Sequence, residues 1–302
     1  MENFIKIVEV GPRDGFQNVK EFIPTEFKKE IIDDLIEANI KKIQITSFVS
    51  PKAIPQLKDS KEITKYVLNK YKNSDVEFFA LVPNLRGAKD AYETGLKEVS
   101  YVISVSESHN KANVNKTTYE SFKELEEIIE KYPDLKVNLD LATAFGCPFE
   151  GEIDENRVIE FIKRAINIGI KDFNLCDTIG ISNPIQIHSI SRRLLEFENL
   201  DLHFELHIHD TRNMGILNTI KAIGNGIVTV QSSIGGLGGC PFAPGASGNT
   251  STEDLVYVLN ELGYNTGIDF DKLLVCAKKI KEKVKGNFSG HQMNIKSEKC
   301  IV

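Results

Sequence analysis

The sequence predicts a (β/α)8 barrel (a TIM barrel) with one or two extra helices at its C-terminal end. Short apolar runs alternate with stretches of helical period along the 302 residues, and eight repeats of about 30 residues fit a closed barrel. An open doubly wound sheet has the same alternation, but no G-x-G-x-x-G motif follows the first strand. No linker rich in proline and glycine divides the chain. We therefore expect one catalytic domain over residues 1–302, with the barrel at about 5–265 and a helical extension at about 266–302.

The first repeat shows how the elements are assigned. Residues 5–10 (IKIVEV) form a short apolar run typical of a buried strand, and residues 25–39 have the period of an amphipathic helix. Thr25 is the expected N-cap of this helix, because its hydroxyl can accept a hydrogen bond from the first turn. The apolar residues of one face are Ile31, Ile32, Leu35 and Ile36.

The remaining elements repeat this alternation. The second strand is expected at residues 42–48, and the others at 77–83, 98–104, 136–143, 172–176, 204–209 and 227–233. Helical stretches lie between the strands, and one or two more helices are expected before Lys285. The eight strands are the number that this barrel requires.

The composition argues against several classes of protein. The net charge of −6 gives no reason to expect a nucleic-acid partner or an anionic membrane surface. No apolar run approaches the ~18 residues of a membrane span. The five cysteines match neither a zinc ribbon nor a C-x-x-C pair, and their odd number argues against a secreted disulfide framework. Because no signal-like leader precedes the first strand, we expect a cytoplasmic protein. We also expect a homodimer or another homo-oligomer.

Unusual residues gather directly after the predicted strands. Active sites of (β/α)8 barrels lie at the C-terminal ends of the strands, so this is where functional residues are expected. The segments are GPRDG (11–15), TSFVSPKAIPQ (46–56), GCPFEGE (146–152), CDTIG (176–180), HIHDTRN (207–213) and GGLGGCPFAPGASGN (235–249).

The segment HIHDTRN predicts a metal site. Residues i and i+2 of a strand point to the same side, so His207 and His209 can direct both imidazoles at one ion, although two solvent-facing polar residues would give the same pattern. Asp14 after the first strand and Asn249 after the eighth can converge on the same point, because strand 8 lies between strands 7 and 1. Such oxygen and nitrogen ligands suit a divalent Lewis acid. The alternatives are a turn-capping carboxylate for Asp14 and a helix N-cap for Asn249.

Three further residues are candidates for chemistry. Arg13 adjoins Asp14 and could stabilise a developing enolate, or form a salt bridge to a rim carboxylate. Cys240 lies in a glycine-rich loop that could close over a site, where a thiol near a cation can exchange protons. A small buried side chain is the alternative for Cys240. Asp177 could position a histidine or a substrate hydroxyl, or simply form a turn.

Several of these motifs together resemble hydroxymethylglutaryl-CoA lyase. The matching segments, which span about residues 5–275, are VEVGPRDGFQN (8–18), TSFVSPKAIPQ, LVPNL (81–85), GCPFEG, DTIG, HIHDT, GLGGCPFAPGASGN and TEDLVY (252–257). The resemblance implies a (β/α)8 barrel, a Mg²⁺ or Mn²⁺ ion, and cleavage of an acyl-CoA substrate to acetoacetate and acetyl-CoA.

The resemblance also implies roles for individual residues. The implied metal ligands are Asp14, His207, His209 and Asn249. Arg13 is the implied enolate stabiliser and Cys240 the implied acid/base on the loop. His207 could shuttle the hydroxyl proton, although a metal-bound neutral imidazole is a poor base. The residues expected to contact substrate are Gln17, Gln44, Ser47, Asp177 and Arg212.

Two departures from the family keep other substrates open. Gln44 stands where the family usually has a glutamate, and Arg212-Asn213 stands where a Tyr-Gly pair is usual. One alternative is therefore a lyase for a related 3-hydroxy-3-carboxyacyl-CoA. Another is a Claisen-type synthase similar to isopropylmalate synthase, which more often carries a regulatory domain after the barrel. A non-catalytic CoA- or metal-binding protein would be expected to have lost Arg13 and Cys240, and both are present.

The assignment of Cys240 predicts a specific kinetic defect. Cys240→Ser should still bind metal and substrate, but the higher pKa of a hydroxyl should slow proton transfer and lower kcat by ~10²–10⁴. Steady-state kinetics with alkylation of the free enzyme measure this, and bound substrate should slow the alkylation. A near-normal kcat with alkylation indifferent to substrate would instead assign Cys240 a packing role.

Overall fold

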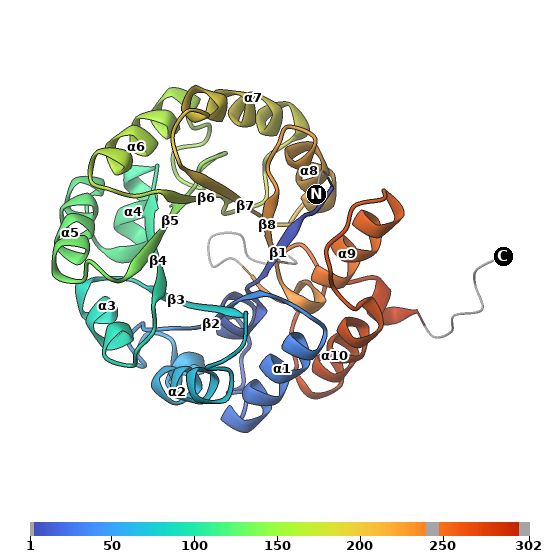
Figure 1. Cartoon of the computed structure of the whole chain (residues 1–302). Helices are drawn as coiled ribbons and strands as arrows, with labels where there is room; N and C mark the ends of the chain where they lie inside the picture. Colours follow the sequence, from blue (N-terminus) through green and yellow to red (C-terminus); the bar gives the residue numbers. More distant parts are fainter. Residues whose placement is uncertain (1–2, 240–247, 296–302) are drawn as a thin grey trace.

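A closed barrel of eight parallel strands forms the centre of the molecule (Figure 1). The computed structural model describes residues 3–239 and 248–295, and Cys240 lies outside these ranges. The strands are β1 (Lys6–Glu9), β2 (Lys42–Ser47), β3 (Glu77–Val82), β4 (Glu98–Ser104), β5 (Lys136–Ala142), β6 (Asp172–Asp177), β7 (His203–Ile208) and β8 (Thr229–Ser232). Each strand pairs with the next, and β8 pairs with β1. The predicted barrel is confirmed, and the open sheet is excluded.

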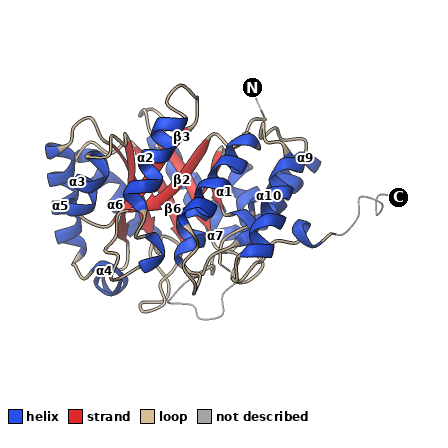
Figure 2. Ribbon diagram, turned by 90° about the horizontal axis from the view of Figure 1, so that it is seen from below, coloured by secondary structure: helices blue, strands red, loops and turns tan. Residues whose placement is uncertain are grey.

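Helices surround the strands on the outside (Figure 2). In the described residues they are α1 (Thr25–Glu37), α2 (Ser60–Lys70), α3 (Leu85–Tyr92), α4 (Glu107–Val114), α5 (Thr118–Lys131), α6 (Glu155–Asn167), α7 (Pro184–Leu194), α8 (Gly215–Ile223), α9 (Thr252–Glu261) and α10 (Phe270–Lys283). The last of these packs against α1, where the Lys279 ammonium contacts the Asp34 carboxylate at 2.5 Å. No helix among the described residues is long and apolar enough to cross a membrane.

Helix α1 shows where pattern-based prediction succeeded and where it failed. Ile31, Ile32 and Leu35 are fully buried against the sheet, as their spacing predicted. The expected N-cap was wrong, because Pro24 precedes the first turn and no side chain caps it. The Thr25 hydroxyl instead donates a hydrogen bond to the Asp59 carboxylate (2.9 Å), which also pairs with the buried Lys28 ammonium (2.8 Å).

The interior of the barrel contains a buried ion cluster. The Lys42 ammonium from β2 lies 2.8 Å from the Glu98 carboxylate of β4 and 3.0 Å from that of Glu205 on β7. Burial alone would lower the pKa of Lys42, but the charges of Glu205 and Glu98 raise it above its ordinary value. Lys42 is therefore a fixed cation shared by two carboxylates inside the sheet, and Glu98 also contacts Lys136 at 3.7 Å.

The loop after β1 is shaped by close backbone packing. Residues Gly11–Gly15 form one π-helical turn, in which the Gly11 N–H donates to the Glu9 carboxylate at 2.7 Å. A Cβ atom on Gly11 would come within 2.6 Å of that same oxygen, so only glycine fits. The turn holds Arg13 and Asp14 at the barrel mouth.

Removing the charge of Lys42 should destabilise the barrel. Lys42→Met leaves Glu205 buried without its cation and Glu98 with only the longer contact to Lys136 (3.7 Å), and breaking such a buried pair typically costs about 3–5 kcal/mol in the free energy of unfolding. Lys41→Met is the matched control, because the Lys41 side chain is 40% exposed and solvent screens its pair with Asp75, so its loss should change stability little. Denaturant unfolding at neutral pH measures both variants, and equal losses would contradict the role assigned to Lys42.

Candidate active site

Three buried side chains from two strand ends converge at the barrel mouth. His207 lies on β7, His209 follows it, and Asp14 comes from the turn after β1. Their candidate ligand atoms lie within 4.8 Å of one another, and the Asp14 Oδ2 atom is 4.0 Å from His209 Nε2. The predicted grouping is confirmed, and the alternative of two solvent-facing histidines is wrong because both are buried.

A chain of polar contacts fixes the tautomer of His207. Its Nδ1 atom lies 3.1 Å from the Gln231 amide oxygen, and the Gln231 amide nitrogen donates to Glu205 at 2.9 Å. The Glu205 carboxylate accepts and is paired with Lys42, so the amide oxygen of Gln231 must face the ring. Nδ1 therefore carries the proton, and Nε2 keeps the lone pair that a metal needs.

Burial and charge set the protonation of this group. Burial and the neighbouring His209 lower the pKa of His207 to about 3, and burial also lowers that of His209. Burial alone would raise the pKa of Asp14, but the Arg13 guanidinium and the two imidazoles hold it below its usual range. At neutral pH the site is thus one carboxylate and two neutral imidazoles, the form that binds a cation.

Asn249 adds a fourth group. Residues 248–250 return along the end of β7, where Asn249 bridges to His209. Its amide nitrogen donates to Asp14 Oδ2 at 2.7 Å, while its buried amide oxygen has no hydrogen-bond partner within the described chain. An unpartnered buried oxygen beside a carboxylate and two imidazoles fits a divalent cation. The helix-cap alternative is wrong, because Ser251 caps α9.

Arg13 is held in place on two sides. Its Nη1 atom donates to Asp14 Oδ1 at 2.5 Å, and its Nε donates to the Gln44 amide oxygen. Gln17 also donates to Asp14 Oδ1, at 2.8 Å. The salt bridge predicted as the alternative role of Arg13 is therefore present, but its partner is the neighbouring Asp14 and not a carboxylate elsewhere on the rim. The guanidinium is a fixed cation beside the ligand group.

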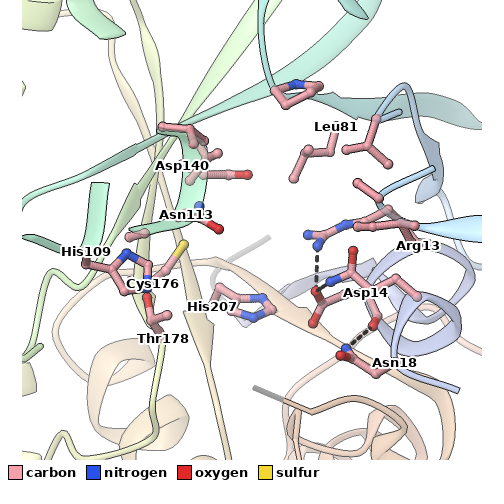
Figure 3. Close-up of a pocket in the computed structure, with 18 of the residues that line it drawn as sticks. Arg13, Asp14, Asn18, Leu81, His109, Asn113, Asp140, Cys176, Thr178 and His207 are labelled. Carbon is pink, nitrogen blue, oxygen red and sulfur yellow. Dashed lines mark hydrogen bonds and ion pairs between the residues drawn. The ribbon is translucent and has the colours of Figure 1, made fainter. Parts of the chain in front are cut away.

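These residues open into a cavity of about 640 Å³ (Figure 3). The strands contribute lining residues that include Leu81, Val102, Asp140, Asn174, Cys176 and Gln231. Lining residues outside the strands include Asn18, Val49, Ser50, Asn113, Asn115 and Gly239. Asp140 and Asn174 were not predicted from the sequence. The available signal was a polar residue at alternate positions of two buried strands, which marks the inward face of a barrel.

Four residues expected to contact substrate lie outside the set that lines the cavity. Gln44 is fully buried behind Arg13, and the buried Ser47 hydroxyl has no hydrogen-bond partner in the described chain. Asp177 accepts hydrogen bonds from Ile181 and Ser182, as the turn alternative required. The exposed Arg212 donates to the Gly180 carbonyl at 3.0 Å. The contact of these four residues with substrate stays a prediction. Gln17, the fifth residue expected to contact substrate, lines the cavity.

Comparisons with known proteins point to one family. The HMGL-like family model matches residues 4–280. The chain is 40% identical to hydroxymethylglutaryl-CoA lyase YngG of Bacillus subtilis over 93% of both chains. It is also 40% identical to the mitochondrial hydroxymethylglutaryl-CoA lyase of Rattus norvegicus, over 89% of this chain and 82% of that one. A solved structure of an HMG-CoA lyase from Acinetobacter baumannii, in complex with coenzyme A and 3-methylmalate, superposes with a TM-score of 0.93. It is 36% identical and covers 100% of this chain and 98% of that one.

The contact between His207 and Gln231 should control metal affinity. Gln231→Leu removes the acceptor that fixes the ring, and loss of such a partner typically lowers metal affinity ~10–100-fold. Gln56→Leu is the matched control, because its amide donates to the Val19 carbonyl away from the ligands. Mn²⁺ titration followed by electron paramagnetic resonance measures both variants. Unchanged affinity in Gln231→Leu would show that the tautomer is fixed in another way.

Proposed function

The chain belongs to the HMGL-like family, and we propose that it is a divalent-metal-dependent lyase that cleaves 3-hydroxy-3-methylglutaryl-CoA to acetoacetate and acetyl-CoA. The observation that carries this function is the convergence of Asp14, His207 and His209 beside the guanidinium of Arg13, in a cavity large enough for an acyl group. Its relatives are named as hydroxymethylglutaryl-CoA lyases.

The ligand group would hold Mg²⁺ or Mn²⁺. Asp14, His207 and His209 would bind the ion, with the Asn249 amide oxygen as a further ligand. When bound, the ion supplies a Lewis acid that polarises the oxygens of the substrate. The family resemblance implies Mg²⁺ or Mn²⁺, the carboxylate and amide oxygens suit such a hard cation, and the choice of metal stays part of the proposal.

Two residues of the chain would then handle the leaving fragment. Breaking the carbon–carbon bond leaves the electrons on acetyl-CoA as an enolate, and Arg13, fixed by Asp14 and Gln44, would stabilise the enolate oxygen. Cys240 would protonate the enolate carbon. Gly239, the residue that precedes it, lines the cavity, which supports this assignment.

A related 3-hydroxy-3-carboxyacyl-CoA is the second candidate substrate. The observation that favours it is Gln44, a neutral amide that contacts Arg13 where the family usually has an anion. A Claisen-type synthase is a weaker alternative, because the relatives compared above are named as lyases. A cytoplasmic homodimer or other homo-oligomer stays a prediction from the sequence.

Acetyl-CoA release from 3-hydroxy-3-methylglutaryl-CoA, compared with that from a panel of 3-hydroxy-3-carboxyacyl-CoA thioesters, tests the function. We expect 3-hydroxy-3-methylglutaryl-CoA to give the highest kcat/KM, chelation to abolish turnover, and Mg²⁺ or Mn²⁺ to restore it. Full turnover in excess chelator, with metal content verified as nil, would contradict the metal-dependent mechanism. A different preferred thioester would favour the second candidate and leave the chemistry unchanged.

A further inference from the structure

Two carboxylates line the described part of the cavity, and they differ in their surroundings. Asp14 accepts hydrogen bonds from Arg13, Gln17 and Asn249 and lies among the metal ligands. Asp140, from β5, lies on the opposite side of the cavity from Arg13 (Figure 3). It is 5% exposed, and it is not one of the grouped ligands. A buried carboxylate facing a cavity without a cation in contact is costly, and such groups are commonly functional.

Neighbouring polar groups orient Asp140. The Asn174 amide donates to its Oδ1 atom at 2.9 Å. Ser100 accepts a hydrogen bond from the Gln44 amide nitrogen at 2.8 Å, which leaves the Ser100 hydroxyl hydrogen to be donated to Asp140. Gln44 can do this only as an amide, because a carboxylate at this position would accept from Ser100. The neutral Gln44 therefore directs a donor toward Asp140.

We propose that Asp140 is the base that accepts the hydroxyl proton of the substrate. The proposal rests on the function proposed above, in which a tertiary alcohol must lose its proton as the bond breaks. The O–H proton moves to the Asp140 carboxylate, and the O–H electron pair forms the new ketone. The bond between the carbinol carbon and the thioester α-carbon breaks, and its electrons become the enolate. The enolate carbon takes a proton from the enzyme acid proposed above, Cys240, which regains one from solvent, and Asp140 returns its proton to solvent.

Other candidates suit this step less well. Asp14 and the two imidazoles are committed to the cation, and Asp177 is occupied by its own turn. Burial raises the pKa of Asp140 to about 6, against the lowering effect of Asn174 and Arg13. The charged or titratable groups around it are Arg13, Cys176, Glu205 and His207. Asp140 is thus ionised at neutral pH, yet more basic than an ordinary aspartate.

Asp140→Asn tests the proposal, with Asp172→Asn as its matched control. Asp172 is also buried in the barrel sheet, but it pairs with Lys136 and does not line the cavity. With the thioester that the parent enzyme cleaves best, Asp140→Asn should lose ~10²–10⁴ in kcat with little change in KM. Asp172→Asn should retain kcat. In the parent enzyme kcat should fall as the pH drops through about 6, where Asp140 becomes protonated.

A second reaction separates catalysis from positioning. Exchange of the acetyl-CoA methyl protons with D₂O forms the same enolate but involves no alcohol, so Asp140→Asn should retain it. Loss of cleavage with retained exchange supports the proposal. Cleavage within ten-fold of the parent, or equal loss of cleavage and exchange, would overturn it. A parent enzyme that cleaves none of the thioesters would instead contradict the proposed function, which distinguishes the two failures.

Discussion

The buried carboxylate of Asp14 is the group on which the site depends. Arg13, Gln17 and Asn249 donate to its two oxygens, and His209 Nε2 lies 4.0 Å away. These groups come from the turn after β1, the end of β7 and the segment before α9, so one carboxylate joins three parts of the barrel mouth. A buried anion needs compensating positive charge. The Arg13 guanidinium supplies part of it, and the cation that the ligands would bind would supply the rest.

A second line of contacts connects the site to the interior of the barrel. Lys42, Glu205 and Gln231 lead from β2 through β7 and β8 to the ring of His207. Each of these side chains forms a hydrogen bond or an ion pair with the next. The contacts that join strands of the barrel therefore also fix the tautomer of His207. The polar interior therefore contributes to both the stability of the sheet and the chemistry at its mouth.

Much of this arrangement could be predicted from the sequence, because it follows from local patterns. Apolar runs located all eight strands, and the i, i+2 spacing correctly placed both imidazoles on one side. What the sequence could not show was which distant groups pair. The Arg212 guanidinium binds the Gly180 carbonyl, and Thr25 donates to Asp59 instead of capping its helix. Asp140 was missed because an inward polar residue on a strand becomes distinctive only once the barrel has closed around it. Cys240 lies outside the described residues, so its role rests on the sequence.

The central claim is that Asp14, His207 and His209 form one metal centre. Anomalous diffraction from crystals soaked in Mn²⁺ tests it most directly, because it locates the ion independently of activity. We expect a single strong peak within coordination distance of all three side chains, and its loss in Asp14→Asn. A peak that contacts none of these residues, or no peak at saturating Mn²⁺ in the parent protein, would contradict the account.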